Sequence, residues 1–404
     1  MAASPLRLWL VCAAALAASG CAPGPTLPPS MTATQASPSG ASQAIEASPP
    51  SPTPEPTPTL TSCRSIAEVL DGPSRVGQLF MVGVSTGGLD QTTRSAISLG
   101  RVGSVVLLGN TSSGIDGVRA LTAELGSLGT AHLPLLIAVD QEGGQVQRLR
   151  GQGFDSIPAA TNQGELGEGE LRAASSVWGD QLRLAGVHYN LAPVADVVPA
   201  NKQRSNEPIG LLSRNYGNDA PTVSRSVVEF VEGMGEAGIA TSLKHFPGLG
   251  EVVTNTDFGA ATDDDITGDH PSLEPFRAGI EAGASSVMIS SAVFTQLDPG
   301  VEGVFSRVII SELLRSDMGF DEVVIADDLG AARSVAGITP ADRAVRFLDA
   351  GGDLVINADP TLMSAMIDAT AAREATDKDF SDRVLDSAER VIRLKASVGL
   401  VDCG

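Results

Sequence analysis

The chain has 404 residues, 42% of them hydrophobic, which is enough for one large domain with a substantial core. Its formal net charge of −21 produces a surface that repels phosphate backbones, so nucleic-acid binding is not expected. The same acidity is compatible with a neutral substrate such as a sugar.

The first 21 residues have the pattern of an export signal. Arg7 precedes an apolar stretch, residues 8–18, that is too short to span a bilayer as a mature helix. Residues 18–21 (ASGC) resemble the bacterial lipoprotein box, which makes Cys21 the predicted lipidation site. An ordinary secretory signal is the alternative. With lipidation, acyl chains anchor the protein to the membrane, and the predicted location is the extracytoplasmic side of a bacterial envelope.

Residues 22–62 are predicted to be a disordered linker. Pro, Ser, Thr and Ala dominate this segment, which has eleven prolines and only Glu46 and Glu55 as charged residues. Such a composition buries too little apolar surface to offset the entropy of ordering, and it favours extended polyproline II. At about 3.1 Å per residue the linker could hold a domain on the order of 100 Å from the membrane.

Two of the four cysteines remain after the signal is accounted for. Cys12 lies in the signal and Cys21 in the lipoprotein box, whereas Cys63 and Cys403 lie at the two ends of the predicted folded region, residues 63–404. In an exported protein this arrangement predicts a disulfide that joins the ends of the domain. Two unpaired thiols are the alternative.

From residue 75 onward, short apolar runs alternate with longer amphipathic stretches. The runs are nearly continuous in hydrophobicity, as parallel strands buried on both faces are, and residues 221–236 illustrate the helical spacing between them. The eight predicted strands are residues 77–84, 102–108, 133–140, 187–192, 239–245, 286–291, 322–327 and 353–357.

Eight strand–helix units predict an α/β fold, specifically a single (β/α)₈ barrel. An open doubly wound sheet is the alternative, but no G-x-G-x-x-G opens a helix after the first strand. Polar residues follow several strands, where barrel enzymes place their chemistry. These strand-end residues are Asp140, Asp196, Lys244, His245, Asp327 and Asp328.

The residues give no sign of a metal or cofactor site. The chain has four histidines, none in an H-x-x-x-H arrangement, and no serine nucleophile elbow or phosphate loop. The expected mechanism is therefore cofactor-free.

Three segments carry a family resemblance: residues 140–148 (DQEGGQVQR), 244–250 (KHFPGLG) and 324–329 (VIADDL). Together with Arg214 in residues 213–217 (SRNYG), they resemble glycoside hydrolase family 3, in particular its single-domain bacterial β-N-acetylhexosaminidases of peptidoglycan recycling. The likeness covers essentially all of residues 65–400. No single motif would suffice, but their order and spacing together are specific.

The resemblance implies roles for individual residues. Asp327 matches the nucleophile of a retaining glycosidase, which forms a glycosyl-enzyme intermediate. Because adjacent strand residues point to opposite sides, Asp328 is expected to face away and to hold a helix N-terminus. The sugar-binding positions of the family correspond to Asp140, Arg148, Arg214, Lys244 and His245.

The chain departs from the family at the general acid/base. Relatives carry an Asp-Ser-His element on a mobile loop after the fifth strand, with the histidine thirteen residues beyond the motif lysine. This chain has Asn255, Thr256 and Asp257 there, and His270 lies too far along to replace the histidine. Either Asp257 is the acid/base, with Asn255 as its loop partner, or the chain is a catalytically impaired sugar-binding lipoprotein.

The resemblance thus implies a hydrolase that releases terminal β-linked N-acetylglucosamine from peptidoglycan fragments such as muropeptides. A β-glucosidase or a phosphorylase of the same family remains an alternative. We expect a small carbohydrate substrate, a lipid anchor in the membrane, no nucleic-acid partner, and action as a monomer.

Overall fold

The computed structural model describes residues 62–129 and 133–404. The predicted signal, the lipidation site Cys21 and the predicted linker up to residue 61 lie outside the described residues. Ser62 is the N-cap of helix α1 (Cys63–Val69), and its side chain accepts a hydrogen bond from the backbone N–H of Ser65. Among the described residues, no helix has both the length and the apolar character needed to cross a membrane.

Eight parallel strands form the central sheet, in the order β11-β9-β7-β6-β3-β2-β1-β12. A parallel bridge between Ile325 and Leu354 joins the two outer strands, so that the sheet closes almost completely. The strands are β1 (Phe80–Ser85), β2 (Ser104–Leu108), β3 (Leu136–Val139), β6 (Tyr189–Asn190), β7 (Ala240–Phe246), β9 (Ser286–Ile289), β11 (Val323–Ala326) and β12 (Val355–Asn357).

Each of the eight predicted runs contains or overlaps one of these strands, which confirms the predicted (β/α)₈ barrel. The alternative of an open doubly wound sheet is wrong, because the outer strands of such a sheet would not meet. Almost every strand residue is buried, as expected for parallel strands covered on both faces.

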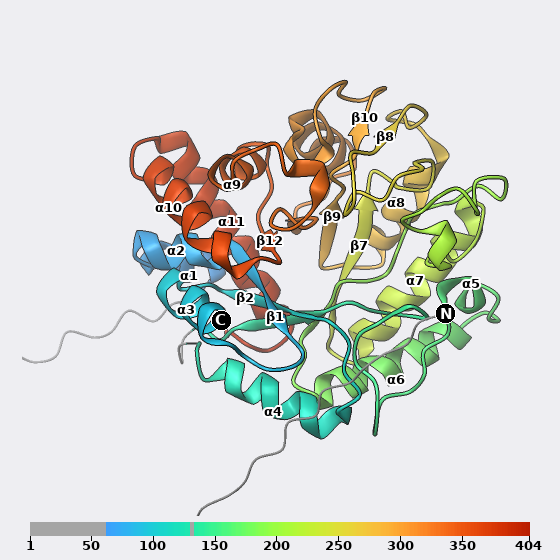
Figure 1. Cartoon of the computed structure of the whole chain (residues 1–404), viewed down its shortest axis with the longest axis horizontal. Coiled ribbons are helices and arrows are strands. Elements are labelled where there is room, and N and C mark those ends of the chain that lie inside the picture. Colours follow the sequence, from blue (N-terminus) through green and yellow to red (C-terminus); the bar gives the residue numbers. More distant parts are fainter. Residues whose placement is uncertain (1–61, 130–132) are drawn as a thin grey trace, which may run out of the picture. The chain divides into compact units, whose positions relative to one another are not determined.

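Helices surround the strands, as Figure 1 shows. After α1 they are α2 (Gly72–Gln78), α3 (Gln91–Gly100), α4 (Gly114–Gly126), α5 (Ala160–Gln163), α6 (Glu170–Leu184), α7 (Ala220–Glu236), α8 (Glu274–Glu281), α9 (Pro340–Asp349), α10 (Met363–Glu374) and α11 (Lys378–Ser397). A π-helix, η4 (Val308–Asp317), connects β9 to β11.

Helix α7 shows how the sequence specifies these elements. Asp219 caps its N-terminus by accepting a hydrogen bond from the backbone N–H of Thr222, and Pro221 occupies the first turn, where a missing N–H costs nothing. The apolar residues at helical spacing are all buried in the larger core cluster: Val223, Val227, Phe230, Val231 and Met234.

Buried apolar residues form two clusters. The larger one fills the space between strands and helices, and the smaller one consists mainly of alternate strand residues inside the barrel, such as Met81, Val106 and Met288. On β11, Val323 and Ile325 belong to the inner cluster, whereas Val324 and Ala326 belong to the outer one. The interior of the barrel is therefore filled with side chains and is not an open channel.

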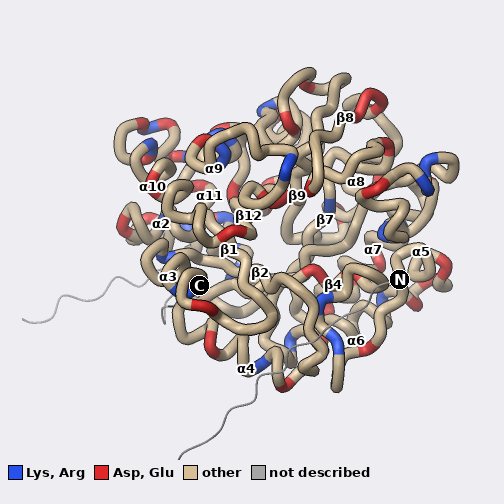
Figure 2. Tube along the Cα trace, in the orientation of Figure 1, with Lys and Arg blue, Asp and Glu red and all other residues tan. Residues whose placement is uncertain are grey.

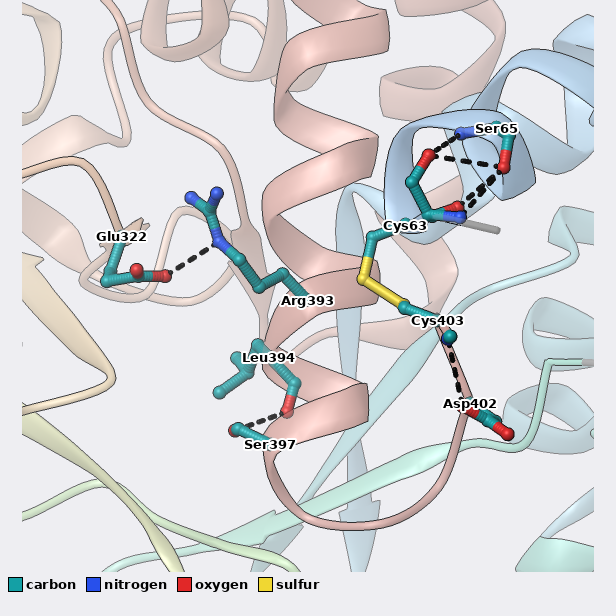
Figure 3. The surroundings of a disulfide bond; sticks show 10 residues. Cys63, Ser65, Glu322, Arg393, Leu394, Ser397, Asp402 and Cys403 are labelled. Atoms are coloured by element: carbon teal, nitrogen blue, oxygen red, sulfur yellow. Dashed lines mark hydrogen bonds and ion pairs between the residues drawn. A yellow bond between two sulfur atoms is a disulfide. The ribbon is translucent and has the colours of Figure 1, made fainter. Parts of the chain in front are cut away.

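The two ends of the folded region are covalently joined. Cys63, at the start of α1, forms a disulfide with Cys403, beyond α11, with a Cα–Cα distance of 4.9 Å (Figure 3). This confirms the predicted pairing. Since α1 packs against α11, the bond fastens two elements that already lie together.

Short strands extend the loops at the carboxyl ends of the barrel strands. The antiparallel pair β4 (Gln141–Gly143) and β5 (Val146–Gln147) follows β3, and β8 (Thr262–Asp263) pairs in parallel with β10 (Val293–Phe294). Acidic and basic positions are interspersed over the helices and these loops (Figure 2). The loops therefore provide ordered supports for polar side chains at one end of the barrel.

Candidate active site

A pocket of about 290 Å³ lies at the carboxyl ends of the barrel strands. This is the end at which barrel enzymes bind and transform their substrates, and the volume suits a small ligand. All eight site residues predicted from the sequence contribute to its lining: Asp140, Arg148, Arg214, Lys244, His245, Asn255, Asp257 and Asp327.

Lys244 lies at the centre of a buried charge network. Its Nζ is 2.6 Å from Oδ1 of Asp140 and 2.7 Å from Oε1 of Glu142, and the lysine side chain is only 2% exposed. Burial alone would lower the pKa of Lys244, but the two carboxylates outweigh it and raise the pKa above its usual value. The lysine therefore remains charged and can donate to a ligand hydroxyl.

Glu142 joins Lys244 to Arg214. The guanidinium of Arg214 donates two hydrogen bonds to this carboxylate, Nε to Oε2 at 2.9 Å and Nη2 to Oε1 at 2.8 Å. Burial would raise the pKa of Glu142, but the charges of Arg214 and Lys244 prevail and hold the pKa well below its usual range. Glu142 thus fixes the positions of two predicted sugar-binding cations.

Reasoning from the sequence missed Glu142, although it lies inside a motif that was singled out. Its position two residues after Asp140 is the available signal, because residues i and i+2 of an extended segment point to the same side. Strand β4 is such a segment, and it ends at Gly143, whose φ of 108° suits glycine.

Lys244 and His245 are neighbours in β7, yet both line the pocket. Successive residues of a regular strand point to opposite faces, but the register between β7 and β9 shifts between Leu243 and Phe246. An extra residue at such an irregularity redirects the side chains around it. The strand therefore presents two consecutive polar groups to the same cavity.

Asp196 holds the ring of His245. Its Oδ2 is 2.8 Å from Nδ1 of the imidazole, and its Oδ1 accepts the backbone N–H groups of His245 (3.1 Å) and Leu249 (2.8 Å). The aspartate is fully buried. The sequence marked Asp196 only as a polar residue after the fourth strand, and the partner forty-nine positions away is visible only in the fold.

Asp327 directly follows β11 and continues its alternation toward the interior of the barrel. Its Oδ1 accepts the backbone N–H of Asp328 at 2.9 Å, and the described residues provide no hydrogen bond to Oδ2. Burial raises the pKa of Asp327, interaction with His245 opposes this, and Asp257 raises the pKa further. One carboxylate oxygen is thus available within a pocket of polar groups.

The expectation for Asp328 needs a correction. Its oxygens accept the backbone N–H groups of Gly330 (2.8 Å), Ala331 (2.9 Å) and Ala358 (2.9 Å), which belong to loops and not to a helix N-terminus. Asp328 also contributes to the pocket lining, while its carboxylate oxygens are bonded to these backbone N–H groups. Because both carboxylate oxygens of Asp328 already accept hydrogen bonds, Asp327 has the carboxylate that is available to a ligand.

Asn255 and Asp257 lie on residues 249–262, which we term the acid/base loop. Oδ1 of Asn255 accepts the backbone N–H of Asp257 at 2.9 Å, so the asparagine shapes the turn and does not contact the carboxylate of Asp257. That carboxylate is exposed and has no hydrogen bond or ion pair to the described residues. His270 caps the 3-10 helix η2 (Pro271–Leu273) instead of lining the pocket.

Arg148 also contributes to the polar lining of the pocket. Its Nη1 makes a long contact of 3.4 Å to Oδ1 of Asn110, and its buried Nε has no partner among the described residues. The guanidinium of Arg148 thus keeps donors that the described residues do not use. Within residues 62–129 and 133–404, no three His, Cys, Asp or Glu side chains are grouped so that they could hold a metal ion.

Comparisons with known proteins agree with this geometry. A Beta-hexosaminidase of Xanthomonas campestris pv. campestris (strain B100) is 36% identical over 252 residues, which is 59% of this chain and 72% of the relative. The crystal structure of a Beta-N-acetylhexosaminidase from Beutenbergia cavernae DSM 12333 is similar with a TM-score of 0.79 and 45% identity, covering 81% of this chain and 99% of that chain.

A glycoside hydrolase family 3 beta-N-acetylglucosaminidase from Paenibacillus sp. str. FPU-7 is similar with a TM-score of 0.74 and 29% identity, over 82% of this chain and 63% of that chain. Residues 73–394 match the Glycosyl hydrolase family 3 N terminal domain. Since this match spans most of the chain, the protein belongs to glycosyl hydrolase family 3 and is a glycoside hydrolase.

Proposed function

We propose that the protein releases terminal β-linked N-acetylglucosamine from peptidoglycan fragments by a double-displacement mechanism with Asp327 as nucleophile. One observation carries the proposal: the available carboxylate of Asp327 lies in a pocket that the predicted sugar-binding side chains also line. The identity of the sugar is supported by relatives that are named beta-hexosaminidase or β-N-acetylhexosaminidase.

In the first step, Asp327 attacks the anomeric carbon while Asp257 gives a proton to the glycosidic oxygen. The bond between carbon and leaving group breaks, and a glycosyl-aspartate forms. In the second step, Asp257 removes a proton from water, the water oxygen attacks the anomeric carbon, and Asp327 leaves as a carboxylate. The neighbouring positions of Asp257 and Asp327 in the pocket support this division of labour.

The polar network supplies complementary contacts for the sugar. Asp140 accepts hydrogen bonds from hydroxyls, whereas Lys244, Arg148 and Arg214 donate to hydroxyl or acetamide oxygens. Because Glu142 and Asp140 already hold Arg214 and Lys244 in place, these two side chains need little further ordering when the sugar binds. Preorganised donors of this kind stabilise the charge that develops in the transition state.

The test is hydrolysis of a chromogenic β-N-acetylglucosaminide by wild type, Asp327→Asn and Asp257→Asn. We expect Asp327→Asn to lower kcat by at least about 10³-fold, and Asp257→Asn to slow substrates with poor leaving groups by about 10²–10⁴-fold. Asp264→Asn is a matched control, since this exposed aspartate lies just beyond the acid/base loop and outside the pocket lining. It should retain wild-type rates.

The nucleophile is tested separately by trapping with a 2-deoxy-2-fluoro glycoside and peptide mass spectrometry. Label on Asp327 supports the covalent intermediate, and label on another residue overturns the assignment. If wild type releases no sugar yet binds muropeptides, the protein is a sugar-binding lipoprotein. If product appears as a sugar phosphate only when phosphate is present, the reaction is phosphorolysis.

We also propose that the protein is anchored outside the cytoplasm by a lipid on Cys21. Support comes from the ASGC segment and from the disulfide between Cys63 and Cys403, since disulfides persist in oxidising compartments. Metabolic labelling with a fatty-acid analogue should label the wild-type chain and not Cys21→Ala. An unlabelled wild-type chain in the culture medium would indicate an ordinary secretory signal.

A further inference from the structure

Two loops that are distant in sequence meet beside the pocket. The acid/base loop follows β7, whereas residues 202–214, which we term the Arg214 loop, lie between β6 and α7. The two segments together supply Arg214, Asn255 and Asp257 to the pocket lining. Contacts between these loops therefore link the segment that carries a proposed sugar-binding residue, Arg214, to the segment that carries the proposed acid/base, Asp257.

Asn206 is the buried link between these loops. Its Nδ2 donates to the backbone carbonyls of Leu249 (2.6 Å), Gly250 (3.2 Å) and Val252 (2.8 Å), at the start of the acid/base loop. Its Oδ1 accepts the backbone N–H groups of Ile209 (3.1 Å) and Gly210 (2.7 Å), in its own loop. The side-chain amide suits this position because its NH₂ group has two hydrogens to donate and its carbonyl oxygen has two lone pairs to accept with.

The contacts continue from Asn206 to Arg214. The carbonyl of Ile209, whose N–H is held by Asn206, accepts the backbone N–H of Arg214 at 3.1 Å. The carbonyl of Pro208 accepts Nη1 of the Arg214 guanidinium at 2.8 Å. A continuous series of hydrogen bonds thus connects the Arg214 guanidinium to the buried amide of Asn206.

The outer edge of the same contact is polar. Lys202 forms ion pairs with Glu251, near the start of the acid/base loop, and with Asp265, beyond its end, the latter at 3.2 Å. Glu207 adds a backbone bond to the carbonyl of Val253 (3.0 Å) and a side-chain bond to the N–H of Asn255 (3.3 Å). Being partly exposed, these contacts are weaker than those of Asn206.

The tip of the acid/base loop is held from the other side. The backbone N–H groups of Arg333 and Ser334 donate to the carbonyls of Asp257 and Thr256, each at 3.2 Å. The acid/base loop, which carries Asp257, is thus hydrogen-bonded on one side to the segment that follows Asp327 and on the other side to the Arg214 loop. Asn206 differs from these tip contacts in that its side chain is fully buried and makes five hydrogen bonds, three of them to the acid/base loop.

We infer that Asn206 is a positioning residue that couples sugar binding at Arg214 to the placement of Asp257, with Lys202 as an outer support. This inference rests on the proposed function, because it assigns the coupling to the acid/base step. A positioning role of this kind predicts a selective loss of acid catalysis, whereas a merely structural role predicts equal losses on every substrate.

The decisive variant is Asn206→Asp. A carboxylate can still accept from Ile209 and Gly210, but it cannot donate to the three carbonyls of the acid/base loop and repels them. Asn215→Asp is the matched control. Asn215 lies in the same stretch of chain and is equally buried, but it bonds Gln203 and Gly217 and makes no hydrogen bond to the acid/base loop.

The readout is kcat/KM for two β-N-acetylglucosaminides, one with a 2,4-dinitrophenyl leaving group and one with a methyl leaving group. Because only the methyl glycoside needs a proton on its leaving oxygen, Asn206→Asp should lower its kcat/KM by about 10²-fold and that of the activated glycoside by less than about 5-fold. Asn215→Asp should leave the ratio of the two values unchanged. Equal losses on both substrates would overturn the inference.

Hydrogen-exchange mass spectrometry tests the coupling without activity. Free N-acetylglucosamine should slow exchange in residues 249–262 of wild type and Asn215→Asp, but not of Asn206→Asp. If the ligand protects this loop equally in all three proteins, the inference is wrong. If wild type cleaves neither glycoside, the proposed function fails, and this experiment still decides the coupling.

A second variant tests the inference independently, so that the test remains possible if Asn206→Asp does not fold. Lys202→Met removes the outer ion pairs and a long hydrogen bond (3.5 Å) to the carbonyl of Glu251. Lys378→Met, at an exposed helix position with one ion pair to Asp382, is its matched control. We expect Lys202→Met to lower the methyl-to-dinitrophenyl ratio of kcat/KM by about 3–10-fold, at the low end of acid/base effects, and Lys378→Met to have no effect. An unchanged ratio in Lys202→Met contradicts the inference.

Discussion

Asp327 and Asp257 are electrostatically linked across the pocket that both line: burial raises the pKa of Asp327, and the negative charge of Asp257 raises it further. The interaction with His245 opposes both. The ionisation of the proposed nucleophile therefore depends on a residue of a separate loop.

The first prediction concerns the acid limb of the pH profile. Asp327 must be ionised to attack, so kcat/KM falls as pH drops through its pKa. Removing the charge of Asp257 in Asp257→Asn lowers this pKa, and the acid limb should move to lower pH. The measurement uses the 2,4-dinitrophenyl glycoside, which needs no acid catalysis. Asp264→Asn should keep the wild-type profile, and an unmoved limb in Asp257→Asn would disprove the link.

The second prediction concerns Glu142, which has two buried cationic partners. Glu142→Gln leaves Arg214 without its carboxylate, and breaking such a buried pair should lower the free energy of unfolding by about 3–5 kcal/mol. Glu68→Gln is the control, since Glu68 is exposed and pairs with one half-exposed arginine, Arg64, at 3.3 Å. Its loss in urea titrations should be about 1 kcal/mol or less.

The loss of stability in Glu142→Gln should also depend on pH. Despite burial, Arg214 and Lys244 hold the pKa of Glu142 in the folded protein below its value in the unfolded chain. The ionised carboxylate therefore stabilises the fold above about pH 4.3, and this stabilisation is lost as pH falls toward the pKa of the folded state. The stability difference between wild type and Glu142→Gln should therefore shrink below about pH 4. A constant difference across this range would contradict the assignment.

The third prediction concerns Lys395, which is fully buried on α11 and whose Nζ donates to Oε1 of Gln78 at 2.6 Å. Burial lowers its pKa to about 7 from 10.5. Between these values the unfolded chain binds more protons than the folded one, so stability rises with pH. Relative to Lys395→Met, wild type should gain up to about 1.4 kcal/mol per pH unit between pH 7 and 9 in urea titrations.

Lys378→Met is the control for this experiment, because its exposed ammonium should contribute no comparable slope. His188 is the titrating neighbour to account for, since burial and then the charge of Lys395 lower its pKa to about 4. It therefore stays neutral throughout the tested range. If the free energies of unfolding of wild type and Lys395→Met change in parallel with pH, the buried lysine does not titrate as stated.

The fourth prediction concerns the disulfide. Cys63 and Cys403 are 340 residues apart, and the chain-entropy relation gives an upper limit of about 6 kcal/mol for closing a loop of this length. The double variant Cys63→Ser/Cys403→Ser should unfold at lower urea concentration while keeping its kcat/KM, because the bond lies outside the pocket lining. Addition of reductant to wild type should have the same effect. If the double variant is as stable as wild type and reductant does not change the stability of wild type, the prediction is wrong.

The sequence by itself determined the barrel, the residues that approach its carboxyl end, and the cysteines at its two ends. Apolar runs and helical spacing report which face of each segment is buried, and eight repeats leave few ways to bury them all. The side chains after the strands, such as Asp327 and Lys244, follow from this arrangement because parallel strands end at one edge.

Only the tertiary structure decided how these side chains are held. Glu142 meets Arg214 across 72 positions, Asp196 meets His245 across 49, and Asn206 meets Leu249 across 43. Periodicity carries no information about such pairs, since each partner is an ordinary polar residue in its own segment. They become specific hydrogen bonds only when closure of the barrel brings the loops together and removes water from between them.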